Sequence, residues 1–188
     1  MSQIPEVQLL QALQQVIDPN TGRDFVSTKQ LRNMKIAGDT VSFDVELGYP
    51  AASQIDGLRA ALVAAARSVP GVGNVSVGLS SKVIAHAVQR GVQLLPGVKN
   101  IIAVASGKGG VGKSTTAANL ALALSAEGAT VGLLDADIYG PSLPLMLGVH
   151  GRPESTDGQT MEPLESHGLQ LMSIGFLVDA DQAMIWRG

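Results

Sequence analysis

Residues Gly107–Thr115, with the sequence G-K-G-G-V-G-K-S-T, have the composition of a loop that holds the phosphates of a nucleotide. Glycines let the backbone turn through positive φ and come close to an anion. Lys113 is predicted to reach the β and γ phosphates, Ser114 to bind Mg²⁺, and Thr115 to bond the α phosphate. The loop therefore predicts binding of a nucleoside triphosphate, here ATP with Mg²⁺. The residues predicted to contact the nucleotide are Gly107, Lys108, Gly109, Gly110, Val111, Gly112, Lys113, Ser114 and Thr115.

Two carboxylates form a second candidate group. Asp135 and Asp137 follow a predicted strand, and residues i and i+2 of a strand point the same way. Ligands of open α/β sheets bind at this end of the strands. Both side chains could therefore face the nucleotide, where hydrolysis needs a group that orients the attacking water and oxygens that hold hydrated magnesium. The alternative is a pair of solvated loop carboxylates.

The elements around the loop predict an α/β fold. The apolar run 101–105 is typical of a buried parallel strand, and 116–127 is predicted to be the helix that points its N-terminus at the phosphates. Further strands are expected at 130–134 and 169–174. We expect the start of a doubly wound parallel-sheet P-loop NTPase domain, which needs more strands than this sequence supplies, so the chain is expected to be truncated at Gly188.

The first 80 residues predict a small α+β unit. Ile4, Val7, Leu10, Leu13 and Ile17 recur at helical spacing. A hairpin is expected from runs 34–36 and 41–47, followed by a helix over 54–69 and a strand over 75–79. This order suits a small sheet covered on one side by helices. The expected domains are a small α+β domain over 1–80, a linker over 81–98 and a P-loop ATPase domain over 99–188.

Composition restricts the partners. The 188 residues carry a net charge of −3, so no basic footprint predicts nucleic acid or an anionic membrane as the main partner. Cysteine is absent, which excludes disulfides and thiolate metal sites within the sequence. The three histidines, His86, His150 and His167, share no ligand spacing. No leader-like or membrane-spanning segment is evident, and a cytoplasmic protein is expected.

Lys108 is unusual, because a phosphate loop does not need a lysine directly after its first glycine. The pattern resembles the deviant Walker A loop of the Mrp/ApbC, MinD, ArsA and nitrogenase iron protein group. In that group this lysine crosses a dimer interface, so the resemblance implies a homodimer in which Lys108 acts on the partner's nucleotide. It also implies that Lys108, Lys113 and Asp137 serve hydrolysis, with Asp135 nearer the water shell of the magnesium. A solvated surface lysine is the alternative for Lys108.

The segment 134–142, L-D-A-D-I-Y-G-P-S, narrows the resemblance to the Mrp/ApbC branch, as do 166–169 and 184–188. Asp18-Pro19 and Gly71-Val72 are similar to the iron-sulfur assembly domain that is fused to bacterial members. The resemblance implies an ATPase that carries iron-sulfur clusters as a dimer and delivers them to apoprotein clients.

Two departures from the family pattern matter. The cluster-binding Cys-x-x-Cys and the switch II Asp-x-Pro-Pro-Gly are absent, so these 188 residues alone are expected to be inert as a carrier and as an ATPase. In the first unit, Tyr49-Pro50 stands where relatives often have a cysteine before the proline. Two other functions remain open. One is a MinD-like or ParA-like positioning ATPase, and the other is a nucleotide-gated adaptor that does not hydrolyse ATP.

Overall fold

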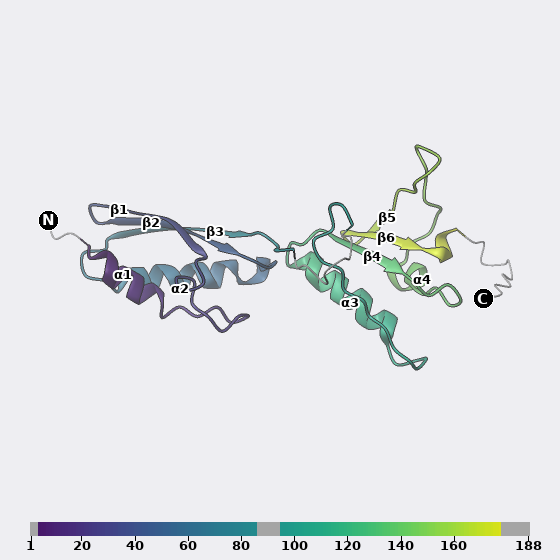
Figure 1. The fold of residues 1–188 in the computed structure, drawn as a ribbon, viewed down its shortest axis with the longest axis horizontal. Coiled ribbons are helices and arrows are strands. Elements are labelled where there is room, and N and C mark those ends of the chain that lie inside the picture. The colour runs from purple at the N-terminus through teal and green to yellow at the C-terminus, as the bar shows by residue number, and fades with distance from the viewer. Residues whose placement is uncertain (1–3, 86–94, 178–188) are drawn as a thin grey trace. The chain divides into compact units, whose positions relative to one another are not determined.

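The computed structural model describes residues 4–85 and 95–177 (Figure 1). The chain divides into two units, residues 1–100 and 101–188, each with its own sheet. The predicted limits 1–80, 81–98 and 99–188 stay a prediction. Among the described residues, no helix has both the length and the apolar character needed to cross a membrane.

The first unit is a three-stranded sheet with helices on one side (Figure 1). Strands β1 (Leu31–Ala37) and β2 (Thr40–Leu47) are antiparallel, and β3 (Asn74–Ser81) is parallel to β2. The helices are α1 (Glu6–Leu13), η1 (Ala52–Gln54) and α2 (Ile55–Arg67). The predicted hairpin, second helix and last strand are thus found.

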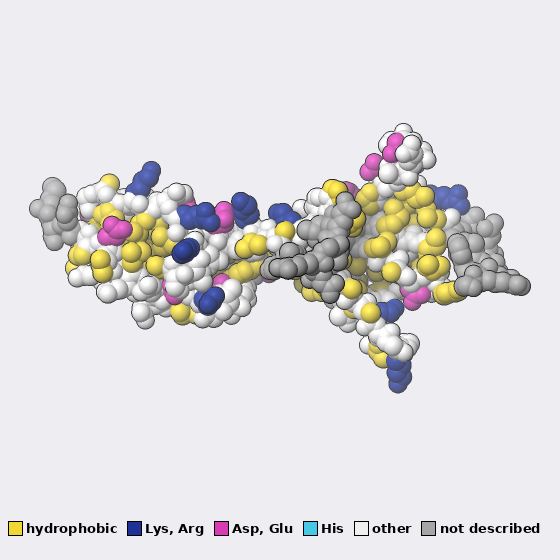
Figure 2. Space-filling view, viewed as in Figure 1, with side chains coloured by type: hydrophobic (Ala, Val, Ile, Leu, Met, Phe, Trp, Pro, Cys, Tyr) yellow, Lys and Arg dark blue, Asp and Glu magenta, His cyan; other side chains and the backbone are white. Residues whose placement is uncertain are grey.

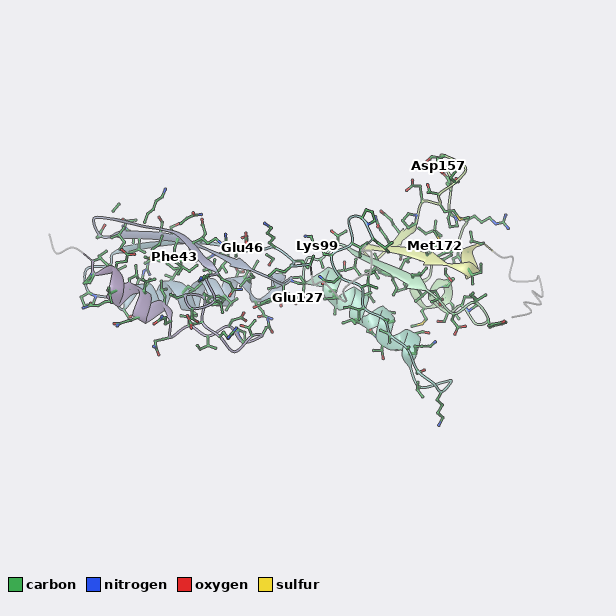
Figure 3. The ribbon with its side chains drawn as sticks, viewed as in Figure 1. Phe43, Glu46, Lys99, Glu127, Asp157 and Met172 are labelled. Atoms are coloured by element: carbon green, nitrogen blue, oxygen red, sulfur yellow. The ribbon has the colours of Figure 1, made fainter. Side chains whose placement is uncertain are left out.

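Strict alternation in β2 places its apolar side chains toward the helices. Val41, Phe43, Val45 and Leu47 are buried in one core with side chains of α1 and α2. Figure 3 labels Phe43 and Glu46, which lie on opposite faces of β2. The strand's period of two therefore fixes which face of this sheet is covered.

The prediction for the first helix is partly wrong. The helix ends at Leu13, and Val7 and Ile17 are 67% and 51% exposed. Leu9, which the proposed spacing left out, is fully buried. A helix of eight residues buries one narrow stripe, here Leu9 and Leu13 at i and i+4, while Leu10 and Ala12 beside it are only partly buried and Val7 faces solvent.

The second unit is a smaller three-stranded sheet, ordered β4-β6-β5. Strands β4 (Val131–Asp135) and β6 (Leu169–Ser173) are parallel, and β5 (Leu164–Ser166) is antiparallel to β6. The helices are α3 (Lys113–Ala126), α4 (Leu143–Leu147) and η2 (Ile174–Phe176). The α/β fold class and three predicted elements, α3, β4 and β6, are confirmed, with bounds shifted by up to three residues.

The predicted strand 101–105 is wrong in this structure. These residues have no regular structure, and Ile101 and Ile102 are each 61% exposed. A strand requires a ladder partner, and within the described residues β4 pairs only with β6. The apolar run therefore has the composition of a strand without the neighbour that would make it one.

Strand β5 was not predicted. It joins β6 through His167 and Gly168, whose φ angles are 51° and 74°. Positive φ at both central residues matches the two-residue turn that antiparallel hairpins favour. The glycine in this turn was the available signal. His86 and the segment 184–188 lie outside the described residues.

Candidate functional site

The predicted phosphate loop opens directly into α3. Gly110 and Gly112 have φ angles of 73° and 87°, and Gly112 is the residue before the first helical one. A side chain in this left-handed region is disfavoured, so glycine permits the turn. No atom lies within 4 Å of the position a Cβ would take at Gly107, Gly109, Gly110 or Gly112. The loop is therefore open to a ligand, with the first amides of a 14-residue helix at its end.

The remaining loop residues divide between the exposed turn and the start of the helix. Lys108 and Val111 are exposed, and the carbonyl of Lys108 accepts a hydrogen bond from Ser106 Oγ at 2.9 Å. Lys113, Ser114 and Thr115 form the first turn of α3, with Lys113 and Ser114 partly buried.

Lys113 and Asp137 lie together although 24 residues separate them. The Nζ atom of Lys113 is 3.4 Å from Asp137 Oδ2, and the two side chains are 33% and 40% exposed. The backbone amide of Gly140 donates to Asp137 Oδ1 at 3.0 Å. This bond and then the ammonium of Lys113 lower the pKa of Asp137 below its usual value. Asp137 is therefore an ionised carboxylate at neutral pH, held beside the phosphate loop.

Asp135 is placed differently. Its Oδ2 accepts hydrogen bonds from the amides of Ser142 and Leu143 at 2.9 and 3.2 Å, and from Ser173 Oγ at 3.4 Å. Its Oδ1 accepts the amide of Asp137 at 3.1 Å. These four bonds occupy much of what a carboxylate can accept. Asp135 thus fixes the loop that carries Asp137, and its predicted place near magnesium stays a prediction.

Sequence reasoning missed the groups that hold Asp135. Ser142 precedes the short helix α4, a position where serine is common. Ser173 pairs in register with Asp135 on the parallel strand β6. The rule that parallel strands end at one edge of a sheet could have found Ser173. The Ser142 hydroxyl is buried and is left without a partner within the described residues.

ATP and Mg²⁺ fit this arrangement. The open glycine loop, the helix N-terminus and one lysine supply donors for phosphate oxygens. The hydroxyl of Ser114, and the carboxylate of Asp135 through water, are oxygen groups of the kind that magnesium binds. Within residues 4–85 and 95–177, no group of three or more His, Cys, Asp or Glu side chains could hold a metal ion by itself.

Each half of the chain matches a known protein family. Residues 97–188 match the family described as NUBPL iron-transfer P-loop NTPase, and residues 6–77 match the family of iron-sulfur cluster assembly proteins. The second half of the chain thus resembles an iron-transfer P-loop NTPase family, and the first half resembles an iron-sulfur cluster assembly family. The two family matches correspond to the two units of the structure.

Named relatives of the chain are also proteins that carry or transfer iron-sulfur clusters. The chain is 44% identical over 184 residues to an iron-sulfur cluster carrier protein of Synechocystis, covering 96% of this chain and 52% of the relative. The carrier protein of Escherichia coli K12 is 45% identical over 171 residues, which are 90% of this chain and 46% of the relative. A mouse iron-sulfur cluster transfer protein, NUBPL, is 54% identical over 96 residues, 50% of this chain and 30% of the relative. The chain thus spans about half the length of the bacterial relatives.

A solved domain of unknown function from Bacillus anthracis overlaps 39% of this chain and 72% of its own, at 18% identity and a TM-score of 0.36. This likeness is too low to carry an argument.

Proposed function

We propose that this chain supplies the ATP-binding part of a protein that hydrolyses ATP and delivers iron-sulfur clusters to apoprotein clients in the cytoplasm. The observation that carries the proposal is the contact of 3.4 Å between Lys113 and Asp137 beside an open glycine loop. The cargo is inferred from the names of the relatives, which are iron-sulfur cluster carrier proteins.

The ion pair suggests how nucleotide engages the site. Asp137 Oδ2 lies 3.4 Å from the Lys113 ammonium at the start of α3. Phosphate oxygens carry more charge and offer more acceptors, so we expect Lys113 to leave Asp137 for the β and γ phosphates. The Oδ2 atom of Asp137 is then free to accept a hydrogen bond from the attacking water. Bound magnesium would neutralise charge between the phosphates, with Ser114 as its ligand from this chain.

Asp135 has an indirect role in this proposal. Its hydrogen bonds to Ser142, Leu143 and Ser173 tie the loop after β4 to the end of β6. The amide of Asp137 is bonded to the same carboxylate. Asp135 is thereby a positioning residue for Asp137, and it contributes to magnesium binding through water.

Lys108 is proposed to act across a homodimer. It is exposed in the loop, and its side chain is not needed for the turn, which the glycines provide. An ammonium contributed by the second subunit would stabilise charge that develops on the γ phosphate during hydrolysis.

The sequence restricts how a cluster is held. It contains no cysteine, so thiolate ligands must come from outside these 188 residues or from a partner protein. The first unit, which matches the iron-sulfur assembly family, is proposed to contact clients.

Calorimetry with ATP and Mg²⁺ on this chain tests the site. Lys113→Ala is expected to weaken binding by about 100-fold or more, because an ammonium bound to phosphate is among the stronger polar contacts. Lys99→Ala, which removes an exposed lysine eight residues before the loop, is the matched control and should bind as the wild type does. Equal affinity of Lys113→Ala and wild type would contradict the assignment of the phosphate loop.

Lys108→Ala tests the homodimer separately. It should leave the affinity of one subunit largely intact and should reduce ATP-dependent pairing, measured by sedimentation. Loss of binding as complete as in Lys113→Ala would show that Lys108 acts within its own subunit.

Two outcomes distinguish the other functions. Cosedimentation with anionic liposomes or DNA would favour a positioning ATPase. Tight ATP binding without turnover in the intact protein would favour a nucleotide-gated adaptor.

A further inference from the structure

The two edges of the first sheet differ in how they are protected. The sheet order β1-β2-β3 leaves one edge of β1 and one edge of β3 without a strand from the described residues. On β1 the pairing is interrupted by a bulge between Arg32 and Lys35, and Asn33 within it has a φ of 53°. Charged residues and bulges are features that keep edge strands from pairing with other chains.

The edge of β3 has neither feature. Its eight residues, N-V-S-V-G-L-S-S, include no charge and no proline. Its pairing with β2 runs without a break from Thr40 opposite Asn74 to Leu47 opposite Ser81. A regular, uncharged edge strand of this length is a template for strand addition.

The two faces of β3 restrict what can be added. Val75, Val77 and Leu79 are partly buried against the core that α2 covers. The intervening side chains, from Asn74 to Ser80, are small, uncharged and exposed on the other face (the sheet's outer side, to which Glu46 also points in Figure 3). An added strand must therefore be apolar on one face and small and polar on the other.

We propose that this edge pairs antiparallel with β3 of a second copy of the chain, which would join two sheets of three strands into one of six. Centred on Val77, the pairing places Val77 opposite the partner's Val77 and Val75 opposite the partner's Leu79. It sets Asn74 opposite the partner's Ser80. Apolar side chains then meet apolar ones on the core side of both copies, and no like charges face each other. A two-fold contact of this kind is self-complementary, as most homodimer contacts are.

This contact is distinct from the nucleotide-dependent pairing proposed through Lys108. It uses main-chain hydrogen bonds of the first unit and requires no ATP. Its failure and the failure of the proposed function are therefore separable by adding or omitting nucleotide.

Two double variants of the whole chain test the register. In Asn74→Lys with Ser80→Lys, each lysine faces the partner's lysine. In Asn74→Glu with Ser80→Lys, each glutamate faces the partner's lysine, and position 80 beside Glu46 of the same chain is identical in both variants. Analytical ultracentrifugation without nucleotide should give a dimer for the wild type. The dissociation constant of the Lys/Lys variant should exceed that of the Glu/Lys variant by roughly 10-fold.

The control is Gln8→Lys with Gln11→Lys, which adds the same charge on exposed positions of α1 and should leave the dimer unchanged. Circular dichroism confirms that each variant is folded. Three results would each overturn the proposal. These are a wild-type chain that is monomeric at every concentration, a dimer that the Lys/Lys pair does not weaken, and a Glu/Lys variant as weak as the Lys/Lys variant.

Discussion

Aspartates in the two units have opposite surroundings. Asp18 in the first unit is fully buried, and its carboxylate accepts hydrogen bonds from the amide of Asn20 and the hydroxyls of Thr21 and Tyr49, at 2.6 to 2.9 Å. The Asp137 side chain in the second unit is 40% exposed, and its Oδ2 atom lies 3.4 Å from the Lys113 ammonium. A buried, saturated carboxylate stabilises one loop conformation, whereas an exposed one beside a movable cation can exchange partners.

The apolar side chains of the two units also differ in how far they are buried. Buried apolar side chains of the first unit come from both helices and from β2, including Leu9, Phe43 and Leu62. In the second unit the side of β4 away from the core carries Leu134, which is 69% exposed, and Figure 2 shows hydrophobic side chains gathered over this unit. The first unit is thus organised by packing, and the second presents its polar site and apolar surface to solvent.

Leu62→Ala is the prediction with the largest effect. Leu62 is fully buried on α2, and truncation of a buried leucine costs about 2–5 kcal/mol because it leaves a cavity. Hydrogen exchange read by mass spectrometry should show loss of protection in β1–β3 and unchanged protection in β4 and β6. Val7→Ala, at a side chain 67% exposed, is the control and should change little. Equal loss in both units would contradict their independence.

Tyr49→Phe removes one donor from the buried carboxylate of Asp18. Loss of a hydrogen bond to this buried carboxylate should lower the free energy of unfolding by about 1–3 kcal/mol, which urea denaturation can measure. Burial, and then the bond to Asp18, raise the pKa of Tyr49 to about 12.

The pKa of Tyr49 is higher in the folded than in the unfolded protein. The contribution of its hydroxyl to the stability of the fold is therefore complete below about pH 10 and declines as the pH rises toward 12. Wild type should therefore lose stability relative to Tyr49→Phe over this range. A constant difference between the two proteins from pH 9 to 12 would show that the raised pKa does not contribute to folding.

The sequence was informative where local pattern and tertiary environment agree. Alternation in 41–47 predicted β2 and its buried face, because a period of two leaves one solution once a core exists. The glycine loop predicted a helix directly after it, from residue 116, and α3 begins three residues earlier, at Lys113. At the other end, Gly128 has a φ of 91°, and the helix closes there: the amide of Gly128 donates to the carbonyl of Ser125, and the amide of Ala129 donates to the carbonyl of Leu124.

Prediction from the sequence failed where a neighbouring segment determines the local structure. The run 101–105 has the composition of a strand but no neighbouring strand to pair with. Helix α1 ends at Leu13, although the apolar residues at helical spacing continue to Ile17. In the site, the contact of Lys113 with Asp137 could be expected from strand order. The bond from Ser173 to Asp135 could be expected from strand order as well, but the bonds from the amides of Ser142 and Leu143 could not, because they depend on how the loop after β4 folds back.

Gly112→Ala measures how much the loop depends on its backbone. With a φ of 87° and no atom near the added methyl group, the cost is conformational, about 1–2 kcal/mol. The cost falls on the loop, so ATP affinity should drop by roughly 10-fold with little change in the melting of the first unit. Gly109→Ala, whose φ is outside the left-handed region and whose Cβ position is equally open, is the matched control. Equal effects of both substitutions would indicate steric exclusion of nucleotide and not backbone strain.

Leu134→Ala is expected to have the smallest effect, and it tests the exposed apolar side of β4. Leu134 and Leu133 are neighbours in one strand with opposite surroundings, because Leu133 packs on the core and Leu134 is 69% exposed. Removing a side chain that is already in water changes stability by about 0.5 kcal/mol or less. Leu133→Ala, with the same change in volume, should cost clearly more because part of its surface is buried. Urea denaturation of both variants gives the comparison directly. If Leu134→Ala were as costly as Leu133→Ala, another segment or a partner must cover this side of the sheet in solution, and the contrast between the units would then lie in what covers them and not in how they fold.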